Sequence, residues 1–85
     1  MASHAPCRSP LMHHDIYLEE ALLSAIQSFQ QRYGTCVEVT RTAKGWHITL
    51  LEGGTFLGDP SALLRELMNE MLVRSLELRL EQMAP

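Results

Sequence analysis

The chain has 85 residues, of which 46% are hydrophobic and 20% charged, and its formal net charge is −3. This length predicts a single domain with a thin margin of stability. The acidic balance argues against binding to nucleic acid and to an anionic membrane surface, because both need clustered Lys and Arg, and no apolar run approaches the roughly 18 residues of a spanning helix.

The N-terminal stretch MASHAPCRSP is rich in small residues and proline and has no apolar region. A secretory signal needs such a region, so we expect a cytoplasmic protein. We predict that residues 1–10 form a flexible tail and that residues 11–85 form a single α+β domain.

The segment SPLMHHD at residues 9–15 is ambiguous. It is either the approach to the first helix or a short strand beside a later hairpin. A two-stranded hairpin alone is only marginally stable, so a third strand would help to cover the helices. Both interpretations remain open.

A first helix is predicted at about 17–33, because its apolar residues repeat with the helical period. Glu19 and Glu20 lie early, where the helix dipole favours anions. Gly34 is a suitable C-terminal stop. The apolar stripe of this helix consists of Leu18, Leu22, Ala25, Ile26, Phe29 and Tyr33.

The period changes to two over residues 35–54, which predicts an antiparallel hairpin with a loop near Gly45. Alternation puts one set of apolar residues on the inner face of the hairpin. We expect this face to pack on Leu22, Ile26 and Phe29 of the first helix. The inner-face residues are Val37, Val39, Trp46, Ile48 and Leu50.

A second helix is predicted at about 60–82, because Asp59 is a good N-cap and Pro60 suits the first helical position. Its apolar residues occupy two arcs when they are placed at about 100° per residue. The first arc suits packing inside the domain and contains Leu63, Leu64, Leu67, Met68, Met71 and Leu78.

The second arc predicts an interface with a second copy of the chain or with a partner enzyme, because an apolar patch of this kind left in water usually marks an interaction site. The alternative is that the first helix or the N-terminal tail folds over it. The residues of the second arc are Leu72, Val73, Leu76, Leu80 and Met83.

Together these elements predict an α+β fold, a small β-α-β-β-α two-layer domain in which an antiparallel hairpin packs against two helices.

The histidine, glutamate and arginine residues that could form a catalytic or metal site are predicted to have ordinary structural roles. His13 and His14 are adjacent, so their side chains diverge and are unsuited to one metal ion. Alternation turns His47 away from the helices. Glu70 and Arg74 are spaced for an i, i+4 salt bridge on a solvent-exposed face with Glu66 and Glu77. We therefore predict no catalytic, cofactor-binding or metal-binding residues.

Two segments, which together span about residues 16 to 80, resemble the HxsD-like family. In IYLEEALLSAIQSFQQRYGTCVEV, an aromatic residue precedes the start of a helix, and a second aromatic residue and a strand follow. LLRELMNEMLVRSLELRL is similar to the C-terminal helix of that family. The matching residues are Tyr17, Glu20, Ala21, Phe29, Asn69, Glu70, Leu72, Leu76 and Arg79.

This resemblance implies a small accessory protein in the His-Xaa-Ser peptide-modification system, which also contains radical-SAM proteins. It implies no catalytic residue. We therefore expect a non-catalytic adaptor in the maturation of a ribosomally synthesised peptide. Its partner would be a radical-SAM-type modifying enzyme, a precursor peptide, or both. The alternative is a stand-alone homodimeric domain with a regulatory or structural role.

Overall fold

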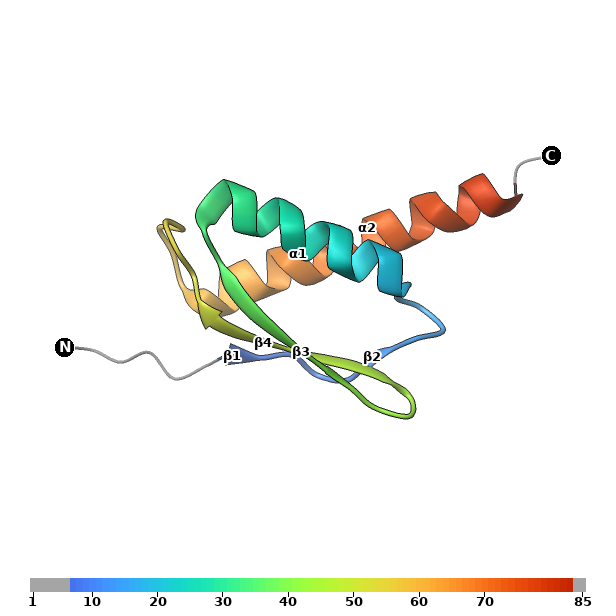
Figure 1. Cartoon of the computed structure of the whole chain (residues 1–85), viewed down its shortest axis with the longest axis horizontal. Coiled ribbons are helices and arrows are strands. Elements are labelled where there is room, and N and C mark those ends of the chain that lie inside the picture. The colour runs from blue at the N-terminus through green and yellow to red at the C-terminus, as the bar shows by residue number, and fades with distance from the viewer. Residues whose placement is uncertain (1–6, 84–85) are drawn as a thin grey trace.

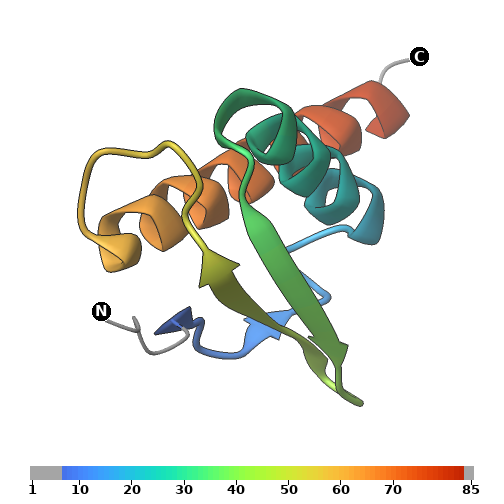
Figure 2. The same ribbon diagram turned by 60° about the vertical axis from the view of Figure 1, so that its left-hand side comes forward.

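The computed structural model describes residues 7–83. Two helices lie side by side over one face of an antiparallel sheet (Figures 1 and 2), which confirms the predicted two-layer α+β fold. In chain order the elements are β1 (Cys7–Arg8), β2 (Met12–His13), α1 (Glu19–Tyr33), β3 (Cys36–Arg41), β4 (Gly45–Glu52) and α2 (Pro60–Met83).

The central strand of the sheet is β4. On one side it pairs with β3, which forms the predicted hairpin, and on the other side it pairs with β1 and β2. Cys7 lies opposite Leu50, whereas Met12 lies opposite Trp46, so the register moves by one residue between the two short strands. The ambiguous segment therefore contributes a strand, and the fold begins with two short strands where one was expected.

Residues 7–10 are ordered, which corrects the boundary of the predicted tail; residues 1–6 of that tail lie outside the described residues. Ser9 explains the order. Its backbone N–H donates to the Ile48 carbonyl at 2.7 Å, and its hydroxyl accepts from the Ile48 N–H at 2.9 Å. Because the Ser9 hydroxyl takes the place of a backbone acceptor, hydrogen bonding to β4 continues one residue beyond β1, to Ser9.

The inner face of the sheet agrees with the alternation of β4. Trp46, Ile48 and Leu50 are all buried. Val39 was expected in this core but is 36% exposed, because β3 lies at the edge of the sheet. Val37 is half-buried and packs against the core. Met12, which lies opposite Trp46, is an additional core residue and only 1% exposed.

Helix α1 begins at Glu19, two residues later than predicted, and ends at Tyr33, where Gly34 caps it in the left-handed conformation with φ 73°. Leu18 occupies the N-cap position without a side-chain cap. Its backbone N–H instead donates to the Ser75 hydroxyl of α2 at 3.0 Å, and this hydroxyl donates to the Met71 carbonyl at 2.8 Å. Ser75 is fully buried, so a serine of α2 satisfies the start of α1.

Ser75→Ala is expected to lower the free energy of unfolding by about 1–3 kcal/mol, because it leaves the Leu18 N–H without its acceptor. Chemical denaturation followed by circular dichroism measures this change. Ser61→Ala is the matched control, since Ser61 is exposed on the first turn of the same helix, and it should change stability by less than about 0.5 kcal/mol. Equal stability of the two variants would contradict the role of Ser75.

Candidate partner-binding site

The outward surface of α2 carries the candidate site. The buried face of this helix consists of Leu63, Leu64, Leu67, Met71 and Ser75. The residues of the predicted interface lie on the opposite side and are named the outer stripe: Leu72, Val73, Leu76, Leu80 and Met83. Leu72 is half-buried, and the exposed fractions of the next four are 46%, 51%, 67% and 79%.

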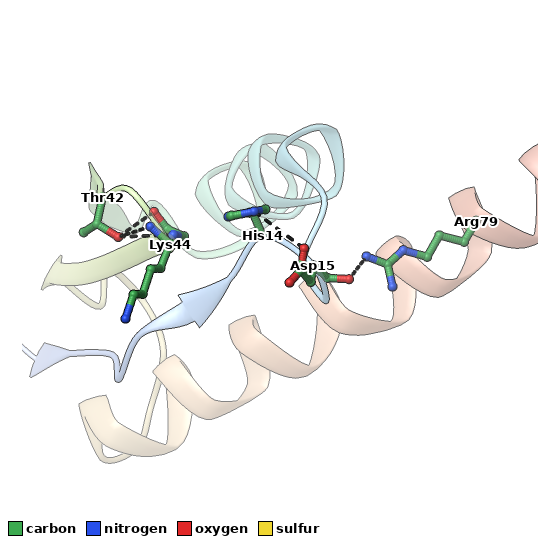
Figure 3. A network of polar contacts seen from close by, with 6 residues as sticks. His14, Asp15, Thr42, Lys44 and Arg79 are labelled. Carbon is green, nitrogen blue, oxygen red and sulfur yellow. Dashed lines mark hydrogen bonds and ion pairs between the residues drawn. The ribbon is translucent and has the colours of Figure 1, made fainter.

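Polar contacts on both flanks of α2 explain why the outer stripe faces solvent. On the α1 side, Arg74 donates to the Ser24 hydroxyl and, at 3.0 Å, to the Ser28 hydroxyl. On the other side, Arg79 donates to the Asp15 carbonyl of the segment that leads into α1 (Figure 3). These contacts turn α2 so that α1 does not cover the stripe, which removes one of the two alternatives to an interface.

The outer stripe has the spacing of a helix-packing surface. Leu72, Leu76 and Leu80 follow one another at i and i+4, and Met83 comes three residues later. Such a row forms a seam that a second helix can fill. The end of α2 also projects beyond α1 (Figure 1), so the last part of the stripe is accessible from several directions.

A groove of about 500 Å³ lies between α1 and α2 and is rich in carboxylates. Arg74 crosses it and forms the predicted salt bridge with Glu70 at 3.7 Å. Both side chains are half-buried, so the pair does not lie on the solvent-exposed face that was expected. Glu66 and Glu77 are exposed, as the sequence predicts. A cluster of carboxylates does not by itself specify a ligand. The groove is lined by Glu20, Ala21, Ser24, Glu70, Arg74, Glu77, Leu78 and Glu81.

The three histidines among residues 7–83 do not form a cluster. His13 lies in β2 opposite Gly45, whereas His14 lies edge-on to the Trp46 ring and 3.5 Å from an Asp15 carboxylate oxygen (Figure 3). His47 faces away from the helices, as expected, and its Nδ1 lies 3.1 Å from the Ser9 carbonyl. Over residues 7–83, no three His, Cys, Asp or Glu side chains are grouped so that they could hold a metal ion.

Tag-free protein is expected to contain no stoichiometric zinc, because His13 and His14 do not converge with a third ligand among the described residues and structural zinc needs four. Elemental analysis by mass spectrometry measures the metal content. The double variant His13→Ala/His14→Ala is the comparison. One zinc per chain in the wild type that is lost in this variant would contradict the prediction.

Comparison with known proteins identified no relative of this chain. No protein-family model, curated protein or solved structure matches this chain. The resemblance to the HxsD-like family therefore remains a prediction. Neither helix of residues 7–83 combines the length and apolar character needed to cross a membrane.

Proposed function

We propose that this chain is a non-catalytic adaptor in the maturation of a ribosomally synthesised peptide, and that the outer stripe of α2 binds the modifying enzyme. The observation that carries the proposal is the exposure of Val73, Leu76, Leu80 and Met83 in one continuous arc. Monomeric proteins rarely leave such a contiguous apolar patch in water.

The shape of the stripe favours a protein partner over a small molecule. Small-molecule sites are concave and enclose most of their ligand, whereas the surface of a single helix is convex. A convex helical row of leucines suits the groove or helix of another protein. The HxsD-like resemblance supports a radical-SAM-type enzyme as that protein.

A second copy of the chain is the alternative partner. The same i, i+4 spacing allows two α2 helices to pack against each other, and a two-fold dimer is the simplest closed assembly. This reading corresponds to a stand-alone homodimeric domain. It differs from the adaptor in one measurable property, which is the molar mass of the isolated protein.

Co-expression with the enzyme encoded beside its gene tests the proposal. A radical-SAM-type neighbour and a stable complex of defined stoichiometry, measured by size-exclusion chromatography with light scattering, are expected. The isolated chain should then have the mass of a monomer. An isolated homodimer that does not bind the neighbouring enzyme would support the alternative, and a genome without such an enzyme would remove the peptide-maturation role.

A further inference from the structure

The outer side of β3 is an open sheet edge. The other side of β3 pairs with β4, and no other strand among residues 7–83 pairs with it. The opposite edge of the sheet is interrupted, since β1 and β2 have two residues each and Pro10 lies between them. Natural proteins protect edges with short strands and proline in this way, but the six-residue β3 lacks both devices.

The backbone groups that face this edge can be assigned from the pairing. Ile48 directs both its N–H and its carbonyl towards Ser9, on the far side of β4. Val39, which is opposite Ile48, is therefore in a non-hydrogen-bonded pair with it, and its own N–H and carbonyl point outward. Since this pattern alternates along an antiparallel strand, Val37 and Arg41 also direct their backbone groups to the open edge.

Apolar side chains lie beside this edge. Helix α1 runs along β3, as contacts at both ends show. Glu19 at the start of α1 forms an ion pair with Arg41 at the end of β3, and the end of α1 leads directly into Cys36 at the start of β3. Leu23 lies about 6 Å along α1 from Glu19, and Val39 lies about 7 Å along β3 from Arg41. The two residues are thus at similar heights along α1 and β3, and they are 54% and 36% exposed.

We propose that the β3 edge binds an extended peptide as an added strand. Outward backbone groups of Val37, Val39 and Arg41 would pair with the main chain of about five peptide residues. Alternate apolar side chains of the peptide would rest on Leu23 and Val39. This inference rests on the proposed function, because a maturation adaptor has to present a precursor peptide to its enzyme.

Charge and area favour a peptide over a second copy of the chain. Glu38 is exposed on the face of β3 that points away from the helices, so a basic residue opposite it gains a favourable cross-strand pair. A six-residue edge with two flanking side chains is small beside the ~800 Å² per partner of a stable protein interface. The occupant is therefore an extended segment with alternating apolar residues and a basic residue on its other face.

Selection from a phage-displayed library of random dodecapeptides tests the proposal. Enriched peptides should alternate apolar residues with polar ones that include Lys or Arg. Their binding should protect the amides of Val37, Val39 and Arg41 from hydrogen exchange. The absence of any enriched peptide, or protection confined to α2, would overturn the proposal.

Val39→Pro is the decisive variant, because it removes an outward N–H and leaves the pairing with β4 intact. Peptide binding should weaken at least ~10-fold. Leu23→Glu, at an exposed helical position, should weaken binding similarly and serves if the proline variant does not fold. Binding as tight as that of the wild type in both variants would overturn the proposal. A wild-type dimer that Val39→Pro dissociates would also overturn it and assign the edge to a second copy.

The two proposals fail separately. Leu76→Glu/Leu80→Glu changes only α2 and should retain peptide binding. If the wild-type protein forms the enzyme complex but binds no peptide, only the β3 inference is rejected. If it binds a peptide but forms no enzyme complex, only the proposed role of the outer stripe is rejected.

Discussion

Trp46→Ala is expected to lower the free energy of unfolding by about 3–5 kcal/mol, which is a large part of the stability of a small domain. Trp46 is 7% exposed and lies on the inner face of the central strand, opposite Met12. Its removal leaves a cavity between the sheet and the helices. Because the substitution deletes the only tryptophan, unfolding in urea should be followed by far-ultraviolet circular dichroism.

Leu51→Ala is the control for this experiment. Leu51 lies in the same strand and is 40% exposed, so its truncation should cost less than about 1 kcal/mol. A Trp46→Ala variant as stable as Leu51→Ala would show that β4 does not face the helices as described.

Periodicity was sufficient to predict the two helices and the hairpin. Leu22 and Phe29 lie on the buried face of α1, because a stripe of apolar residues at 3.6-residue spacing has to be covered. Asp59 and Pro60 marked the start of α2, where the Asp59 carboxylate accepts from the Ser61 N–H at 3.1 Å. These elements are determined by local sequence patterns, so they could be predicted before the structure was known.

The N-terminal strands depend on tertiary contacts and could not be predicted in the same way. Ser9 and Pro10 are typical of turns, and β1 and β2 are too short to show an alternating period. Their order comes from pairing with β4, which is more than thirty residues away. The role of Ser75 is hidden for the same reason, because its partner Leu18 lies at the start of another helix, far away in the sequence.

The two candidate surfaces differ in what the sequence reveals. Two apolar arcs on one helix could be recognised from spacing alone, and the first of them supplies the buried Leu63 and Leu67. The open edge of β3 required the order of the strands. Alternation places Val39 on the inner face, but only the position of β3 at the edge of the sheet explains why Val39 is exposed.

The double variant Leu76→Glu/Leu80→Glu is expected to weaken the complex with the modifying enzyme by roughly 100-fold, equivalent to ~2.7 kcal/mol. Both side chains are more than half exposed, so the isolated domain should keep its melting temperature. In the complex, two carboxylates would be buried against apolar surface without partners. Isothermal titration calorimetry measures the affinity, and thermal unfolding measures the stability.

Gln27→Glu/Gln31→Glu is the matched control, because it also adds two negative charges one helical turn apart, on the exposed surface of α1. This control should bind the enzyme as the wild type does, which separates the loss of apolar contact from a general effect of charge. If the α2 variant unfolds, the outer stripe belongs to the core of the domain. If it folds and binds normally, the enzyme uses another surface. Only loss of binding with retained stability assigns the outer stripe to the partner.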